Sequence, residues 1–321
     1  MNLLGVDLSS LGEQFEQTVP GRVLLLDGDG AAYRASSTAK TLPTVIKRFI
    51  TEVLTQQFLT GSDEVRIHLT GKGGLKAHRD LYPAAKPYQG NRKGKPKPPL
   101  LEPLRELLAT PEALEYHVPP EWDITLHRWW EADDALVMDS IQYGDRGVVD
   151  SDDKDLRLCP GPYWEAKLGA LDIITDRFGW ISEDYTPTLK LKVKGHGTKF
   201  FWAQMLMGDK ADNVQGLSKL DGKLIGEAGT LDYLTPITCE HEAANRILWA
   251  YARNGQDALA EAQLLWLRRS QDDCAYRYIS ELDLDPKLRT WLDGLQAYHT
   301  AVLAAKIKER EDERDSHAEV D

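Results

Sequence analysis

The sequence predicts an α/β fold built on a doubly wound, mostly parallel sheet, with a helical region after it. Short apolar runs alternate with segments of helical periodicity over the first half of the chain, as strands and crossover helices do in such folds. Two of the runs, Val23–Leu26 and Gly147–Val149, are apolar throughout and end directly at an aspartate. Continuous apolar strands are typical of a parallel sheet whose two faces are both covered.

The remaining elements follow in order along the chain. They are indicated by apolar residues at helical spacing, by alternation of apolar and polar residues, and by a cluster of leucines. We expect a helix over residues 45–54, a strand over 65–69, a helix over 100–108, a strand over 124–126, and helices over 133–141, 200–207 and 240–267. The helix at 133–141 has acidic residues in its first turn, where the positive end of the helix dipole stabilises them.

Length and composition allow one large domain with a helical appendage. The chain has 321 residues, of which 42% are apolar, and this suffices for a sizeable core. We expect a leader at residues 1–21, an α/β domain at 22–199, a helical region at 200–305 and a disordered charged tail at 306–321. No signal peptide or transmembrane helix is expected, because the N-terminus has neither a basic start nor a long apolar stretch.

Charge is segregated along the chain. The net charge is −12, yet residues 72–97 hold eight Lys and Arg and a single acid, Asp80. A basic segment rich in Gly and Pro fits a path near phosphates, and a solvated loop is the alternative explanation. The three cysteines form no CxxC pair, so neither a zinc site nor a disulfide framework is indicated, and we expect a reducing compartment.

Acidic residues recur in four clusters, with a weaker fifth in the C-terminal tail. The four are Asp27-Gly-Asp29, Glu131-Ala-Asp133-Asp134, Asp150-Ser-Asp152-Asp153-Lys-Asp155, and Asp209 with Asp212. Two of them directly follow apolar strands, and sites in doubly wound sheets form outside the carboxyl ends of the strands. Gathered carboxylates repel one another unless cations bind, and their hard oxygens favour Mg²⁺ or Mn²⁺. Two such ions are a common means of hydrolysing a phosphodiester.

The order of these motifs resembles the 5′-nuclease superfamily of flap endonucleases and 5′–3′ exonucleases, most of all the stand-alone phage exonucleases. The matching motifs are a strand ending in Asp-Gly, a basic segment with Tyr-x-Gly-Asn-Arg, then Glu-Ala-Asp-Asp, Ser-x-Asp-x-Asp and Gly-Asp-x-x-Asp-Asn-x-x-Gly, between about Val23 and Leu234. The resemblance implies a PIN-like catalytic domain with a basic helical arch at about residues 72–105. It also implies a helix–hairpin–helix (H3TH) DNA-binding region after that domain.

The resemblance further implies two divalent ions held by eight carboxylates. Asp27, Glu131, Asp133 and Asp134 would hold the first ion, and Asp153, Asp155, Asp209 and Asp212 would hold or surround the second. Asp29, Asp150 and Asp152 would lie beside the ligands. For any single aspartate, helix capping or surface solvation is the alternative explanation. Charge on the phosphate would be neutralised by Arg34, Arg79, Lys86 and Arg92.

The basic segment matches the arch through which a 5′ single strand is threaded, and such binding is salt-dependent and blind to sequence. Tyr82 and Tyr88 would stack on bases, with ordinary packing as the alternative. Further DNA contacts are expected from Lys93, Lys95, Lys97, Gly216, Lys219, Gly222 and Lys223. The hairpin of the family commonly binds K⁺ through backbone carbonyls. Lys190, Lys192, Lys194 and Lys199 would extend this track or belong to a solvated strand face.

Three positions depart from the family pattern. Gln89 stands where the arch usually has a lysine that assists attack on the phosphate, and Lys86 or Lys93 would substitute for it. Thr70-Gly71 stands where a further aspartate ligand is usual, and Lys219 and Asp221 replace glycines of the hairpin. The remaining carboxylates suffice for two ions.

The expected function is a divalent-metal-dependent 5′–3′ exonuclease or 5′ flap endonuclease acting on DNA and on RNA in RNA–DNA hybrids. Its partners would be DNA 5′ ends, flaps and duplex, together with replication proteins, in the cytoplasm of a cell or of a phage host. One alternative is a flap- or end-binding protein with weakened catalysis. Others are a haloacid-dehalogenase-type phosphatase, with Asp27 as nucleophile and Asp29 as general acid, and a PIN-type RNA nuclease.

Overall fold

The structure is a computed structural model that describes residues 2–3, 6–7 and 18–318. The chain divides into two compact units, the first comprising Met1–Gly74 and Pro96–Thr175, the second Leu75–Lys95 and Asp176–Asp321. The predicted leader lies mostly outside the described residues, apart from the short antiparallel strands β1 (Asn2–Leu3) and β2 (Val6–Asp7). The predicted boundary at residue 199 falls inside the second unit.

A six-stranded sheet forms the centre of the first unit, with the strand order β5-β4-β3-β6-β7-β8. The first five of these strands run parallel to their neighbours, and β8 pairs antiparallel with β7. The predicted doubly wound, mostly parallel sheet is therefore confirmed. Its strands are β3 (Val19–Asp27), β4 (Ser62–Thr70), β5 (Asp123–His127), β6 (Gly147–Asp150), β7 (Gly161–Glu165) and β8 (Ala170–Ile174).

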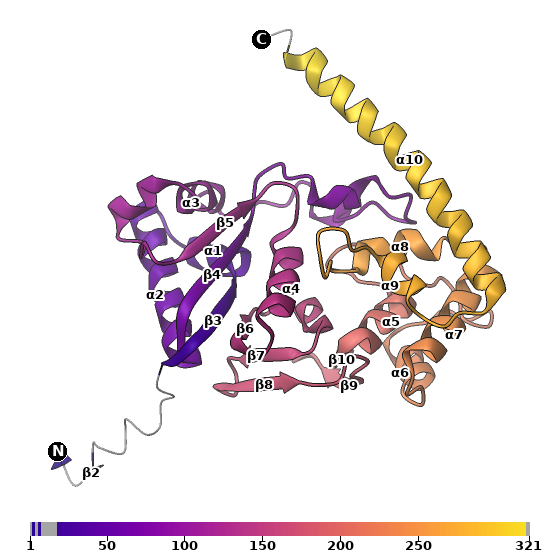
Figure 1. Cartoon of the computed structure of the whole chain (residues 1–321), viewed down its shortest axis with the longest axis horizontal. Coiled ribbons are helices and arrows are strands. Elements are labelled where there is room, and N and C mark those ends of the chain that lie inside the picture. Colours follow the sequence, from indigo (N-terminus) through magenta and orange to yellow (C-terminus); the bar gives the residue numbers. More distant parts are fainter. Residues whose placement is uncertain (1, 4–5, 8–17, 319–321) are drawn as a thin grey trace. The chain divides into compact units, whose positions relative to one another are not determined.

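Helices cover both faces of this sheet (Figure 1). On one face, α1 (Gly28–Ser36), α2 (Leu42–Thr60) and α3 (Leu101–Leu108) pack on alternate residues of β3 and β4 in one buried apolar cluster. On the other face lies α4 (Ala132–Tyr143), which contacts β3, β4 and β6. Because both faces are covered, the residues of β3 from Val23 to Leu26 are fully buried, as the apolar run predicted.

The strand order reverses between β3 and β6, which pair directly in the middle of the sheet. Asp27 is the last residue of β3 and Asp150 the last residue of β6. Ligand sites in open α/β sheets form at such a reversal, outside the carboxyl ends of the strands. The sheet topology therefore brings the first and third acidic clusters to one edge.

The turn from β3 into α1 fixes Asp27 in place. Asp27 is the N-cap of α1, and its Oδ1 accepts a hydrogen bond from the Gly30 amide at 3.0 Å. Gly28 must remain glycine, because a Cβ there would lie 2.6 Å from the carbonyl oxygen of His68. This close approach places the start of the helix directly against β4.

The second unit combines a two-stranded hairpin with helices. The hairpin pairs β9 (Trp180–Tyr185) with β10 (Leu191–His196). The helices are α5 (Gly197–Met207), α6 (Glu227–Leu234), α7 (Glu240–Arg253), α8 (Ala258–Leu265), α9 (Ala275–Ser280) and α10 (Pro286–Ala318). The basic segment carries two short 3-10 turns, η2 (Lys76–Leu81) and η3 (Gly90–Arg92). The sequence did not predict the two hairpins β7–β8 and β9–β10.

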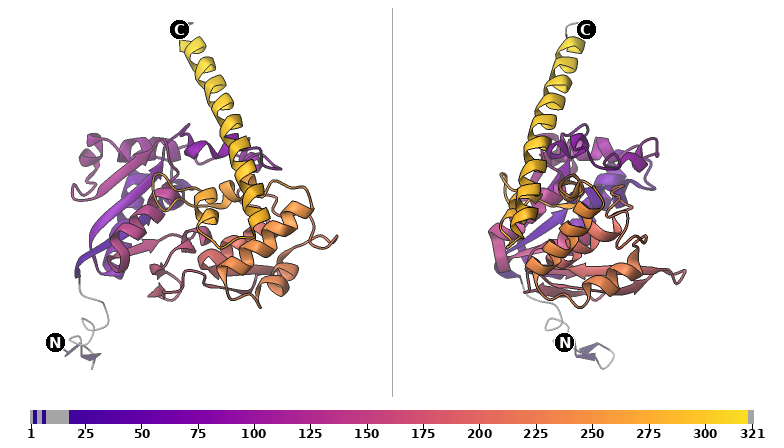
Figure 2. Two further views of the ribbon diagram at one scale, coloured as in Figure 1. Left: turned by 45° about the vertical axis from the view of Figure 1, so that its right-hand side comes forward. Right: turned by 90° about the vertical axis from the view of Figure 1, so that its right-hand side faces the viewer.

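The last helix differs from the expectation of a disordered tail. Figure 2 shows α10 as one long helix, which packs on α7, α8 and α9 and continues to Ala318. Buried Leu288 and Leu292 anchor its first turns, and the residues after them are mostly Ala, Leu, Lys, Glu and Arg, which favour helix. Residues 319–321 lie outside the described part. Nowhere in that part is a helix both long and apolar enough to cross a bilayer.

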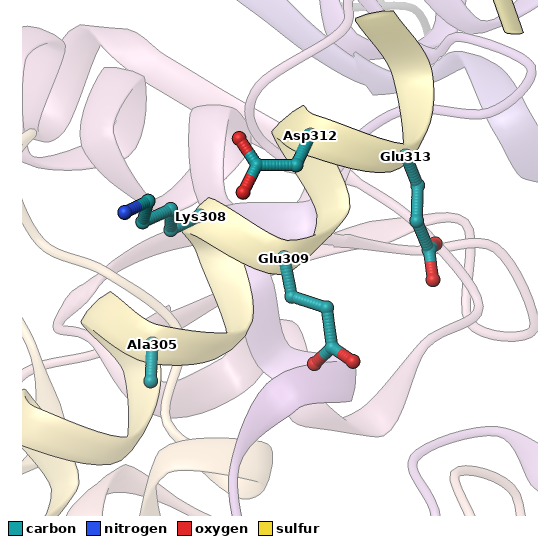
Figure 3. A pocket seen from close by; sticks show the side chains of 5 residues that line it. All are labelled: Ala305, Lys308, Glu309, Asp312 and Glu313. Carbon is teal, nitrogen blue, oxygen red and sulfur yellow. The ribbon is translucent and has the colours of Figure 1, made fainter. Parts of the chain in front are cut away.

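Five side chains of α10 line an open depression on its own surface (Figure 3). Lys308 and Asp312 lie on one side of the helix, and Glu309 and Glu313 on another, as their spacing by four residues requires. One helix alone supplies the walls, which carry three carboxylates. We assign this depression no binding role.

Candidate active site

Six of the predicted ligands belong to the first unit and come from three elements near the carboxyl end of the central strands. They are Asp27 at the end of β3, Glu131, Asp133 and Asp134 at the start of α4, and Asp153 and Asp155 in the turn after β6. α4 starts here because Glu131 caps it: its side chain accepts from a first-turn amide, and Asp134 accepts from the Glu131 amide at 3.4 Å.

Hydrogen bonds join Asp27 to the turn that holds Asp153. Oδ2 of Asp27 accepts from the Ser151 hydroxyl at 2.8 Å, and the same hydroxyl oxygen accepts from the Asp153 amide at 3.0 Å. Asp153 in turn caps a 3-10 turn by accepting from the Asp155 amide at 2.9 Å. Ser151 therefore fixes the first and third acidic clusters relative to each other.

The charges of these clusters meet at Asp133. Burial, together with the negative charges of Asp27, Asp153 and Glu131, raises the pKa of Asp133 well above its usual value. Asp29 adds a fourth negative charge that disfavours ionisation of Asp133. A cation bound beside Asp133 would relieve this repulsion.

The donor chemistry of this cluster fits hard divalent ions, because every candidate ligand is a carboxylate oxygen. Over the described residues, no three His, Cys, Asp or Glu side chains already form a ready-made metal site. Both oxygens of Asp27 and one of Asp153 accept hydrogen bonds from donors of the chain itself.

Cations of the chain lie around the cluster in the first unit. Arg34, the predicted phosphate ligand, pairs with Asp152 at 2.8 Å and with Glu52 at 2.6 Å. Arg105 pairs with Asp29 at 3.0 Å. Thr70, which stands at the missing aspartate position, accepts from the Ala132 amide at 2.9 Å and so helps to hold the start of α4.

Asp209 and Asp212 belong to the second unit, where the chain's own donors engage both of them. Asp209 accepts from the Gln204 side chain at 3.1 Å and from the Ala211 amide at 2.6 Å. Oδ1 of Asp212 accepts from the Gln89 side chain at 3.0 Å and from the Arg92 guanidinium at 2.6 Å.

The basic segment is fastened to the loop that carries these aspartates. The Gln89 amide donates to the Asp212 carbonyl at 2.9 Å, Asn91 donates to the Lys210 carbonyl at 2.7 Å, and Asn213 donates to the Pro87 carbonyl at 2.8 Å. Oε1 of Gln89 accepts from the Lys76 ammonium. Gln89, which stands where the motif resemblance expects a lysine, therefore bridges Lys76 and Asp212.

Other predicted residues of the segment divide into buried and exposed groups. Arg79 is buried and donates to the Trp266 carbonyl at 2.8 Å, which favours a structural role. Tyr82 packs edge-on against His299, and Lys76 lies over the Tyr88 ring. The exposed residues are Lys86, Lys93 and Lys95, together with Lys97, which belongs to the first unit and pairs with Glu102.

A tight turn lies between α5 and α6, in the segment where the hairpin was expected. Leu220 and Lys223 exchange two backbone hydrogen bonds, and Asp221 and Gly222 between them have φ values of 48° and 80°. Lys219, Gly222 and Lys223 are exposed. Lys199 is different from the other lysines upstream: it is buried and donates to the Thr235 and Ile237 carbonyls, so it does not extend a basic track.

Glu261 of α8 is a buried residue that the sequence analysis missed. Its carboxylate accepts from the backbone amides of Ala85 at 2.9 Å and of Gln215 and Gly216 at 3.1 Å. One side chain thus holds both the basic segment and the loop before the hairpin. Its only sequence signal was an acid inside a mostly apolar helical stretch, Ala258 to Leu265.

Neither a family model nor a curated protein matches the chain. It is similar to solved structures of T5 5′-exonuclease and T5 D15 protein. A structure of T5 5′-exonuclease with bound zinc has 14% identity and a TM-score of 0.45, covering 81% of this chain and 97% of that chain.

Two further structures cover more of this chain. T5 D15 protein co-crystallised with metal ions has 14% identity and a TM-score of 0.42, covering 88% of this chain and 98% of that one. The bacteriophage T5 D15 flap endonuclease, in a complex with DNA and metal ions, has 15% identity, the same TM-score of 0.42 and the same coverage.

Proposed function

We propose that the protein is a divalent-metal-dependent 5′ nuclease that hydrolyses phosphodiesters of DNA, as an exonuclease or at 5′ flaps. The hydrogen-bonded link from Asp27 through Ser151 to Asp153 is the observation that carries the proposal. It supports a shared cation site at the reversal of strand order, where the ordered acidic motifs predicted one.

Asp27, Glu131, Asp133 and Asp134 would hold one ion and Asp153 and Asp155 a second. Bound divalent ions neutralise charge on a phosphodiester and acidify the attacking water. The chain's own part is to fix the carboxylates, through Ser151 and the cap of α4, and to keep Arg34 near the phosphate.

DNA binding is the second part of the proposal. The exposed lysines of the basic segment would bind the backbone of a 5′ single strand. The turn at Asp221-Gly222, between α5 and α6, would be the hairpin of a helix–hairpin–helix motif. This motif would contact duplex phosphates through Lys219, Lys223 and backbone amides. Potassium at the hairpin, RNA–DNA hybrids as substrates and replication partners remain proposals of the motif resemblance.

The test is a cleavage assay with Mg²⁺ or Mn²⁺ on 5′-labelled flap, blunt duplex and RNA–DNA hybrid, with the paired change Asp153→Ala and Asp155→Ala. We expect cleavage by the wild type and none by the variant, and calorimetric titration with Mn²⁺ should show weaker binding to the variant. Cleavage that survives in the variant would overturn the site assignment.

Two other functions are separated by the same assay. Tight flap binding without cleavage in either metal would identify a binding protein. Hydrolysis of a small phosphate monoester, without activity on DNA, would identify a phosphatase that uses Asp27 as nucleophile. The hydrogen bonds at Asp27 disfavour the phosphatase, because Gly30 and Ser151 engage both oxygens of the carboxylate that would have to attack.

A further inference from the structure

Two tryptophans precede the acidic start of α4, and one of them is exposed. Trp129 is 45% exposed, and its ring stands edge-on to that of Trp130 with centroids 5.9 Å apart. Large aromatic side chains are normally buried, and among the tryptophans whose burial is described only Trp129 and Trp180 rank as exposed. An exposed indole beside a candidate active site needs a reason.

The backbone on both sides of the pair is fixed. Before it, β5 ends at His127, whose carbonyl accepts from the Gly71 amide at 2.8 Å. After it, Glu131 caps α4. A Cβ on Gly74 would lie 3.2 Å from the Arg128 carbonyl, so the loop from Gly71 packs closely on this segment. The backbone that carries the two rings is therefore held in place on both sides.

Basic side chains lie near the two rings on one side, and the acidic cluster lies near them on the other. Lys72 is exposed on the packed loop, and Arg128, adjacent in sequence, is 63% exposed at its side chain although it pairs with Glu106. Glu131 is two residues from Trp129, so their Cα atoms lie at most about 7 Å apart. A phosphate next to this acidic cluster would need bound divalent ions, whereas a base needs only an accessible aromatic face.

We propose that Trp129 and Trp130 form a stacking platform for unpaired nucleobases of the strand that enters the metal site. This rests on the proposed nuclease function and specifies its substrate: a single-stranded 5′ segment rather than blunt duplex. Bases within a duplex are already stacked on each other and do not offer their faces, so the platform discriminates between the two. Neither ring belongs to a motif of the resemblance, and the basic segment's own tyrosines are less exposed.

The test measures binding without cleavage, in Ca²⁺, by fluorescence anisotropy of a labelled single strand, a 5′ flap and a blunt duplex. Trp129→Ala should weaken binding of the single strand and the flap by about 5- to 150-fold, and leave blunt duplex unchanged. Trp129→Phe should retain most of the affinity, because a phenyl ring also stacks. Trp130→Ala should have a smaller effect in the same direction, since its ring is less exposed.

Trp180→Ala is the matched control, because Trp180 is 44% exposed but lies on β9 of the other unit. Loss of single-strand affinity in Trp129→Ala, with Trp180→Ala at the wild-type value, supports the platform. Wild-type affinity in Trp129→Ala, or an equal loss for blunt duplex, overturns it. A platform effect in a protein that cleaves nothing in Mg²⁺ would refute the nuclease proposal and leave the platform standing.

Discussion

The acidic residues of the two units differ in the groups that surround them. In the first unit, Asp133 lies among carboxylates that raise its pKa. In the second unit, Asp212 accepts hydrogen bonds from Gln89 and Arg92, and Asp209 from Gln204 and a backbone amide. The first cluster would therefore gain from a bound cation, whereas the chain itself already balances the second.

This difference sets an order of metal affinity. A divalent ion near Asp133 relieves repulsion between carboxylates, but an ion that binds Asp212 must compete with a guanidinium at 2.6 Å. We expect the tighter ion in the first unit. Binding of an ion at Asp212 would also break the ion pair between Asp212 and Arg92.

The largest effect is expected from Asp133→Asn. Cleavage should fall by more than about 100-fold, because loss of a ligand exceeds the effect of losing an outer partner. In EDTA the same variant should melt at a higher temperature than the wild type. A raised pKa in the folded state means that the ionised carboxylate destabilises the fold at neutral pH, and the amide removes that charge.

Asp145→Asn is the control, because Asp145 lies in the same unit and is exposed. It should change neither the rate of cleavage nor the melting temperature in EDTA. Thermal unfolding with and without Mg²⁺ measures the effect. If Asp133→Asn melts lower in EDTA, or is stabilised by Mg²⁺ as much as the wild type, the contrast between the two clusters is wrong.

The next effect concerns the second unit and its buried carboxylate. Glu261→Ala leaves the amides of Ala85, Gln215 and Gly216 without their acceptor, at a cost of roughly 2–5 kcal/mol in the free energy of unfolding. Glu261→Gln keeps one acceptor oxygen and should lose less. Urea unfolding measures both, and a loss below about 1 kcal/mol in Glu261→Ala would mean that these hydrogen bonds contribute little.

A pH-dependent effect is expected at Asp150. Burial, with repulsion from Asp152, raises the pKa of Asp150 from 3.8 to about 7. The folded state thus binds this proton more tightly than the unfolded state, so its contribution to stability is lost as pH rises from about 4 to about 7. Asp150→Asn should be more stable than the wild type at pH 8, by up to about 4 kcal/mol, and equal to it near pH 4.

Urea unfolding in EDTA at the two pH values tests this, with Asp145→Asn as a control that should show no such trend. A stability difference between Asp150→Asn and the wild type that does not grow with pH would show that the burial of Asp150 does not perturb its ionisation.

Local patterns were enough to predict the sheet and the candidate acidic site of the first unit. The apolar run before Asp27 and the acidic first turn of α4 are signals within a few residues, and the parallel topology then brings them together. Trp129 and Glu261 had no such signal. Their roles depend on exposure and on amides far away in the chain, such as Ala85, 176 residues from Glu261.

The long-range partners of single residues were equally out of reach. Gln89 was recognised as a departure from the family, but its bridge between Lys76 and Asp212 follows from the fold of the basic segment. Lys199 was grouped with exposed lysines because it lies near them in sequence, and helix α5 instead turns it into the core of its unit.

The smallest effect is expected from Gln89→Lys, which introduces the lysine that the motif resemblance expects at this position. A lysine can still bind Asp212, but it no longer accepts from Lys76 and places a second cation beside it. These changes oppose each other, so stability should change by less than about 1 kcal/mol and cleavage of a 5′ flap by less than about tenfold. Gln89→Met, which removes both hydrogen bonds without adding charge, is the control. A rise in kcat of about 100-fold or more for Gln89→Lys alone would mean that this position acts on the phosphate, and that the second unit supplies catalytic groups rather than only a self-balanced acidic loop.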